Sequence, residues 1–103
     1  MSYSIRLTRA AEQDLDDIFA YIALALQAPQ NAAGQLERLE RGIASLDSLP
    51  GRFRVYEREP WKSRGLRLMP VDQYLVFYIP DFEMETVTVL RIMYSGRNAE
   101  RHL

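Results

Sequence analysis

The chain has 103 residues, of which 48% are apolar and 26% charged, and this size predicts one globular domain over residues 1–103. It has no cysteine and a single histidine, His102, which argues against a disulfide framework, a thiolate zinc site or any other metal site. The net charge of −1 argues against a dedicated nucleic-acid binder, and the lack of a signal-peptide pattern or a long apolar run predicts a cytoplasmic protein with no membrane contact.

The first half of the chain predicts a short strand followed by a helical hairpin. Residues 3–7 alternate between apolar and polar as a strand does, and Thr8 is a suitable helix N-cap. Apolar residues then recur every three or four positions over residues 9–27 and again over residues 30–48. Because proline is tolerated only in the first turn of a helix, Pro29 is expected to end the first helix and to begin the second.

A basic segment follows the predicted hairpin. Residues 1–49 carry a net charge of −3 and residues 50–103 carry +2, and most of the positive charge lies between positions 52 and 67. Two acids, Glu57 and Glu59, accompany these cations. The basic residues of the segment are Arg52, Arg54, Arg58, Lys62, Arg64 and Arg67. The segment is either a solvated loop laced with salt bridges or a surface that binds a partner.

The second half of the chain predicts three strands. Residues 65–71, 74–79 and 86–95 are rich in β-branched and aromatic residues, and Pro80-Asp81 is typical of a turn between the last two. A strand, two helices and a three-strand antiparallel meander make an α+β fold, with the hairpin on one face of a mostly antiparallel sheet. Residues 97–103 are long enough only for a tail or a short helical turn.

Both faces of the predicted sheet are largely apolar. Two helices can cover only one of them, so a loop, a tail or another chain must cover the other. Strict alternation in the last strand places Leu90, Ile92 and Tyr94 on one face and Val87, Val89, Arg91 and Met93 on the opposite face. We therefore predict an exposed apolar surface that binds a partner, built from Val76, Tyr78, Val87, Val89 and Met93.

The residue types that could support chemistry are few. One terminal histidine, no cysteine and no glycine-rich phosphate loop argue against a nucleophilic triad, a zinc hydrolase or a nucleotide-binding enzyme, and no cofactor is predicted. Arginines together with a tyrosine or glutamate can cleave RNA without metal, the arginines neutralising a phosphate while the base activates the 2′-hydroxyl. The candidate catalytic residues are Tyr94, Arg91, Arg67 and Arg64, with Glu57 as another possible base. The alternative is that Tyr94 packs on the sheet edge and the arginines form ordinary surface pairs.

Three stretches of the sequence give it a family likeness. They are LTRAAEQDLDDIFAYI from residue 7, YLVFYI from residue 74 and VTVLRIMYSGRNAERHL from residue 87. In this order and spacing they resemble the RelE/ParE superfamily of toxins from bacterial type II toxin-antitoxin systems, over nearly the whole chain. The resemblance implies the fold described above and a growth-inhibiting, plasmid-stabilising toxin that a cognate antitoxin neutralises. The predicted apolar surface would then be the antitoxin-binding site.

The resemblance also bears on the target. In the superfamily that this chain resembles, the members that cut messenger RNA on the ribosome share an arginine at the position of Tyr74, and they are strongly basic. We therefore favour the ParE-like branch, which acts on DNA gyrase, with a RelE-like ribosome-dependent nuclease as the alternative and a non-toxic interaction module as a further one. The toxin-antitoxin complex is expected to bind operator DNA through the antitoxin. The residues expected to contact the target are Arg54, Arg58, Lys62, Arg64, Arg67 and Arg97.

Overall fold

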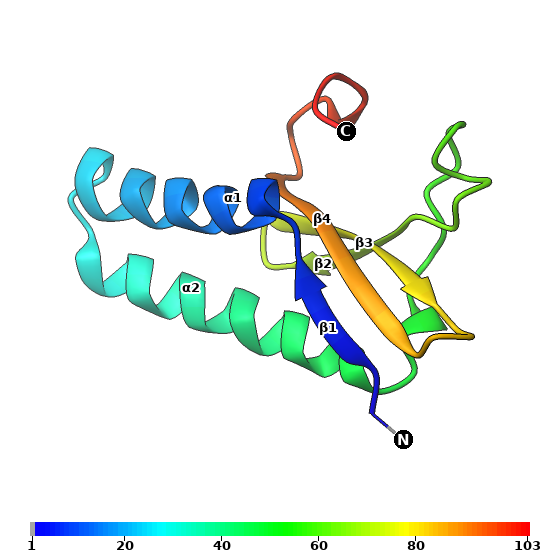
Figure 1. Ribbon diagram of the computed structural model, residues 1–103. Coiled ribbons are helices and arrows are strands. Elements are labelled where there is room, and N and C mark those ends of the chain that lie inside the picture. Colours follow the sequence, from blue (N-terminus) through cyan, green and yellow to red (C-terminus); the bar gives the residue numbers. More distant parts are fainter. Residues whose placement is uncertain (1) are drawn as a thin grey trace.

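The structure, a computed structural model, describes residues 2–103 and shows the predicted order of a strand, two helices and three strands (Figure 1). Met1, which the predicted domain includes, lies outside the described residues. The elements are β1 (Ser4–Leu7), α1 (Arg9–Ala20), a π-helical turn (Tyr21–Ala25), α2 (Pro29–Ala44), short 3-10 turns (Ser45–Asp47 and Pro50–Arg52), β2 (Arg67–Val71), β3 (Tyr74–Asp81), β4 (Thr86–Tyr94) and a last 3-10 turn (Ala99–Arg101).

The helical hairpin is confirmed at both of its predicted starts. Thr8 caps α1, its Oγ1 accepting a hydrogen bond from the amide of Ala11 at 3.1 Å, and Pro29 occupies the first turn of α2. Gly42 lets α2 approach the sheet closely, because a Cβ there would lie 2.9 Å from Cγ2 of Val71. The two helices therefore pack together on one face of the sheet, with their connection at one end of the molecule (Figure 1).

The sheet has the strand order β1-β4-β3-β2, in which β1 runs parallel to β4 and the other neighbours are antiparallel. The turn predicted at Pro80-Asp81 is wrong, since β3 continues to Asp81 and the chain reverses at residues 82–85. Pro80 pairs only with Val87 of β4, because β2 pairs with β3 no further than Tyr78. A strand position with a neighbour on one side only can accommodate a residue that lacks a backbone donor.

A β-bulge changes which side chains of β4 share a face. Phe77 pairs with Arg91 and Tyr78 with Val89, so Leu90 is an extra residue in β4. Beyond it the alternation reverses, and Ile92 packs with Val89 in the helix-covered core while Leu90 joins the opposite face. The strict alternation predicted from the sequence is therefore wrong beyond residue 89.

The residues predicted to form an exposed apolar surface are all buried, so that assignment is wrong. Four of its five residues lie fully buried beneath the two helices, and the fifth, Met93, is buried on the opposite face. The helix-covered core contains Val76, Tyr78, Val87 and Val89. These side chains are unavailable to a partner because the chain's own helices already exclude water from them.

The opposite face is covered by this chain itself. A second core of Leu66, Leu68, Phe77 and Met93 lies there, against side chains from the loop 53–66 and from the C-terminal tail. The covering side chains include Tyr56, Trp61, Ala99 and Leu103. Of the three covers that the sequence left open, the fold uses a loop and a tail.

Candidate functional site

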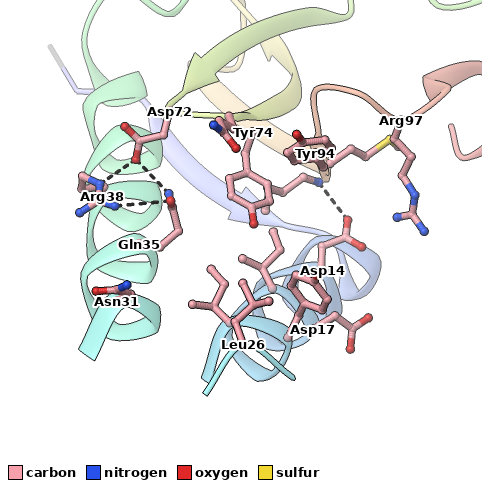
Figure 2. Close-up of a pocket in the computed structure, with 16 residues that line it drawn as sticks. Asp14, Asp17, Leu26, Asn31, Gln35, Arg38, Asp72, Tyr74, Tyr94 and Arg97 are labelled. Atoms are coloured by element: carbon pink, nitrogen blue, oxygen red, sulfur yellow. Dashed lines mark hydrogen bonds and ion pairs between the residues drawn. The ribbon is translucent and has the colours of Figure 1, made fainter. Parts of the chain in front are cut away.

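A groove of about 930 Å³ opens where the helical hairpin meets the far ends of β2, β3 and β4 (Figure 2). We call it the hairpin groove. Its lining combines apolar, aromatic, amide and charged side chains from α1, the π-helical turn, α2 and the sheet. They are Asp14, Asp17, Ile18, Tyr21, Ile22, Leu26, Asn31, Gln35, Arg38, Asp72, Gln73, Tyr74, Ile92, Met93, Tyr94 and Arg97.

Three tyrosines form the aromatic part of the hairpin groove. The rings of Tyr74 and Tyr94, paired across β3 and β4, meet edge to face with centroids 6.0 Å apart, and Tyr21 lies nearby on the π-helical turn. Burial raises the pKa of Tyr74, and the neighbouring Tyr21 and Tyr94 act in the same direction. Tyr74 is therefore a neutral hydroxyl at physiological pH and a poor general base.

One rim of the hairpin groove is fixed by a polar network between α2 and the β2–β3 turn. Arg38 Nε and Gln35 Nε2 both donate to Oδ2 of Asp72, at 2.6 and 3.0 Å (Figure 2). These hydrogen bonds, first that of Arg38 and then that of Gln35, lower the pKa of Asp72. The network neutralises most of the charge on this rim, leaving Asp17 and Arg97 as the other exposed charges of the groove.

The other side of the groove borders an ion pair between the buried Asp14 and the half-buried Arg91. Arg91 Nε and Nη2 donate to the two carboxylate oxygens of Asp14 at 2.8 and 2.9 Å, and the amide of Ile92 donates to the same carboxylate. The remaining Arg91 Nη1 donates to the backbone oxygen of His102 at 2.6 Å. Hydrogen bonding to Asp14 raises the pKa of Arg91. The guanidinium is thus fully engaged in joining α1, β4 and the C-terminal tail.

The hairpin groove continues onto an exposed apolar surface at the end of the hairpin. Leu24 is 76% exposed, Leu26 56% and Tyr21 58%, and Phe19 is also exposed. Residues 18–36 contain no charged side chain. Exposed apolar area of this kind, joined to a groove, marks a surface that binds another protein. No helix within residues 2–103 is both long and apolar enough to cross a membrane.

The four candidate catalytic residues do not converge. Arg67 pairs with Tyr78 on the helix-covered face, and its Nη1 donates to the backbone oxygens of Gly51 and Phe53. Arg91 pairs instead with Phe77, whose side chain belongs to the opposite face. Arg64 lies on the loop, with its guanidinium carbon 5.2 Å from the ring centre of Trp61. Only Tyr94 of the four is exposed in the hairpin groove.

The predicted target-binding residues lie in three separate places. Arg67 is engaged internally, Arg97 borders the hairpin groove, and the other four lie on the exposed loop between β2 and the hairpin. On that loop Arg58 pairs with Glu100 at 2.8 Å and Lys62 with Glu57 at 3.4 Å. The four loop residues are Arg54, Arg58, Lys62 and Arg64. They remain exposed to solvent, so they could still contact a partner.

The hairpin groove was not predicted from the sequence, although one signal pointed to it. The segment IFAYIALAL, residues 18–26, is apolar on every side of a helix, whereas a helix lying on a core needs only one apolar stripe. The excess apolar residues are those that the structure leaves exposed. Among residues 2–103 no three His, Cys, Asp or Glu side chains come together as a metal site would require. The exposed apolar side chains and the groove beside them are suited to binding a protein segment.

Comparison with known proteins gives a family match over most of the chain. Residues 5–99 match the family described as the ParE toxin of type II toxin-antitoxin systems, parDE. A search of curated protein sequences finds no match.

Solved structures with the same fold come from toxin-antitoxin systems. A chain of the chromosomal ParDE system of Pseudomonas aeruginosa superposes with a TM-score of 0.72 at 20% identity, covering 90% of this chain and 96% of that one. A chain of the RelBE2 complex of Mycobacterium tuberculosis gives 0.64 at 24% identity, covering 91% and 99%. A chain of the RelE-RelB complex of Pyrococcus horikoshii gives 0.62 at 16% identity, covering 95% and 100%.

Proposed function

The chain belongs to the ParE toxin family of type II toxin-antitoxin systems, and from this premise we propose that it arrests growth in the cytoplasm by inhibiting DNA gyrase and that a cognate antitoxin neutralises it. One of the solved structures with the same fold is described as coming from a ParDE toxin-antitoxin system and two as complexes, RelBE2 and RelE-RelB, which supports an antitoxin partner. In this proposal the complex binds operator DNA through the antitoxin.

In this proposal the antitoxin binds in the hairpin groove. It takes the place of the surface predicted from the sequence, whose residues are buried. An amphipathic helix or extended segment can place apolar side chains among Ile22, Leu26 and the three tyrosines, while its polar side chains face Asp17 and Arg97. This chemistry matches a protein segment better than a small charged ligand, because most of the charge in the groove is already paired internally.

The arrangement of the arginines supports gyrase inhibition over RNA cleavage. A metal-free nuclease must direct several cations at one phosphate, whereas here Arg91 and Arg67 are engaged by acceptors of the fold itself. The exposed cations of the loop, Arg54, Arg58, Lys62 and Arg64, are then proposed to bind the target. One observation favours the nuclease alternative: Tyr94 and Arg97 line the same groove, and the amide of Arg97 donates to the Tyr94 carbonyl.

Two parallel assays test the target. Purified protein is assayed for inhibition of gyrase supercoiling and for cleavage of messenger RNA on programmed ribosomes, as wild type and as Tyr94→Phe. We expect gyrase inhibition that is unchanged in Tyr94→Phe. Ribosome-dependent cleavage that falls roughly 100-fold in Tyr94→Phe, with gyrase unaffected, would establish the nuclease alternative instead.

A charge substitution in the hairpin groove tests the antitoxin site. Leu26→Glu puts a carboxylate on an exposed position of the groove, so it should leave the fold intact and weaken antitoxin binding roughly tenfold or more. Met84→Glu is the matched control, because Met84 is 72% exposed on the turn between β3 and β4, and Figure 1 shows this turn at the end of the molecule opposite the connection of the hairpin. If the two variants bind the antitoxin with equal affinity in a calorimetric titration, the antitoxin does not bind in this groove.

A further inference from the structure

A second exposed apolar surface lies at the end of the molecule opposite the hairpin tip. Here the β3–β4 turn and the loop that follows α2 meet near the start of β1, which lies close to this turn in Figure 1. Leu49 is 78% exposed, Met84 72% and Phe82 55%. We call it the turn surface, formed by Tyr3, Leu49, Pro50, Gly51, Phe82 and Met84.

The turn surface contains a defined hollow. A groove of about 470 Å³ lies between Leu49 and Phe82, and the ring of Tyr3 meets that of Phe82 edge to face at 6.4 Å. Gly51 also lines the hollow, and a Cβ at this position would lie 3.3 Å from Cζ of Phe82. The hollow is wide enough for one large apolar side chain of a partner.

Leu49 is unfavourable at its position in the free protein for three separate reasons. Its backbone is left-handed, with φ at 48°, which a branched residue without a special contact avoids. It precedes a proline, which disfavours helical backbone of this kind. Its side chain is mostly in water, so it contributes little burial to the fold. The turn uses this backbone, because the Leu49 carbonyl accepts from the amide and the side chain of Arg52, but the exposed leucine side chain adds no burial and is better explained by a role in binding.

The turn surface is held rigid from both sides. Asp81 Oδ1 accepts hydrogen bonds from the amides of Glu83 and Met84, which fixes the turn. On the loop side the Tyr78 hydroxyl donates to the Pro50 carbonyl, and Arg67 donates to the Gly51 carbonyl. The apolar side chains are thus presented on an ordered backbone, which lowers the entropy lost on binding.

The charge around the turn surface selects its partner. Asp81 and Glu83 are exposed and Glu85 is half-exposed, and none of the three forms an ion pair within residues 2–103. Arg52, a cation that borders the hollow, donates to the backbone oxygens of Ser45, Ser48 and Leu49. An acidic rim repels nucleic-acid phosphates and anionic lipid headgroups, and it attracts lysine and arginine.

We propose that the turn surface docks a segment of the growth-arrest target, one that carries a large apolar side chain flanked by lysine or arginine. The assignment to the target rests on the proposed function, because an enzyme that handles DNA must present basic surfaces. The β3–β4 turn and the loop 53–66, which is drawn in green, both lie away from the connection of the hairpin in Figure 1, so one large target can contact both. The hairpin groove remains available to the antitoxin at the other end.

Leu49→Asn is the main test. Asparagine tolerates left-handed backbone, so the variant removes the apolar side chain without adding strain, and its thermal stability should equal or exceed that of wild type. We expect gyrase affinity and growth arrest on induced expression to fall roughly tenfold, while antitoxin affinity stays unchanged. Glu83→Lys should weaken gyrase binding as well and reduce its sensitivity to salt.

Controls separate the possible failures. Leu24→Asn makes the same chemical change at the hairpin tip and should leave gyrase binding intact. A folded Leu49→Asn protein that arrests growth and binds gyrase like wild type would overturn the proposal. If the toxin alone dimerises and Leu49→Asn abolishes the dimer, the turn surface binds a second copy of the chain, and the proposal is overturned as well. If the wild-type protein neither arrests growth nor binds gyrase, this result would refute the proposed function and, with it, the assignment of the turn surface to the target.

Discussion

One face of the sheet is covered by two regular helices, α1 and α2, whereas the opposite face is covered by the irregular loop 53–66 and the C-terminal tail. Under the helices, side chains such as Leu39 and Val76 are fully buried, and the contact is almost entirely apolar. On the opposite face the covering backbone is irregular, the apolar core is smaller, and polar contacts such as the hydrogen bond from Arg91 to the His102 carbonyl position the cover. Burial stabilises the first face, and directional contacts position the cover of the second.

This contrast shows why an apolar sheet face need not be a binding site. A strand that is apolar on both sides requires a cover, but a loop rich in charge can supply it by turning a few aromatic side chains inward, as Tyr56 and Trp61 do. Most of the exposed large apolar residues lie instead near the end of the hairpin and on the turn surface, and Tyr94 adds one at the end of β4. The available binding area is therefore at the ends of the elements and on their connections, not on a whole face of the sheet.

The largest effect is expected beneath the helices. Leu39→Ala removes a fully buried side chain of α2 and leaves a cavity in rigid surroundings, which should lower the free energy of unfolding by about 3 kcal/mol. Urea denaturation measures it, with Leu24→Ala as an exposed control expected to change stability by less than about 0.5 kcal/mol. A Leu39→Ala loss as small as that of the control would mean that this face is not the main source of stability.

The ion pair that joins the two faces comes next. Asp14→Ala leaves the Arg91 guanidinium and the Ile92 amide without their acceptor, and we expect a loss of about 2–3 kcal/mol in the free energy of unfolding. Asp14→Asn retains one acceptor oxygen and should lose less. Chemical denaturation of both variants checks the order. If Asp14→Ala is as stable as wild type, the pair contributes nothing net and the link between the faces is apolar.

A smaller effect is expected on the opposite face. Trp61→Ala removes a half-buried ring from the second core, and we expect a loss of about 1–2 kcal/mol together with faster proteolysis of the loop 53–66. Arg64→Ala, which removes the exposed side chain whose guanidinium lies over that ring, should cost about 0.5 kcal/mol or less. If Trp61→Ala and Leu39→Ala lower the free energy of unfolding equally, the two faces do not differ in their contribution to stability.

The smallest effect is expected at Asp72, on the rim of the hairpin groove. Its folded pKa lies below the ordinary value of 3.8, so its contribution to stability is present above the unfolded pKa and is lost as the pH falls through the folded pKa. Asp72→Asn keeps the shape and tolerates the positive φ of 54°. The small advantage of wild type over Asp72→Asn in thermal unfolding at neutral pH should therefore vanish in strong acid. An advantage independent of pH would exclude the charge of Asp72 as its source.

The sequence by itself determined the order and type of the elements. The change from a helical to a two-residue period near residue 50, the cap at Thr8 and the start at Pro29 depend only on local backbone and solvation preferences, and all three are confirmed. The family likeness, carried by the same local patterns in their order, is confirmed by the match over residues 5–99. Local rules are reliable here because each involves residues a few positions apart.

Only the tertiary structure decided which apolar residues are exposed and what each arginine does. The bulge at Leu90 reverses the faces of β4, and no pattern within that strand marks it, because it depends on the register with β3. Arg91 could be a catalytic cation or a structural one until Asp14, 77 residues away in the chain, is placed beside it. The hairpin groove and the turn surface likewise form where segments distant in the sequence meet. The periodicity of one segment does not show which other segments lie beside it in the folded protein.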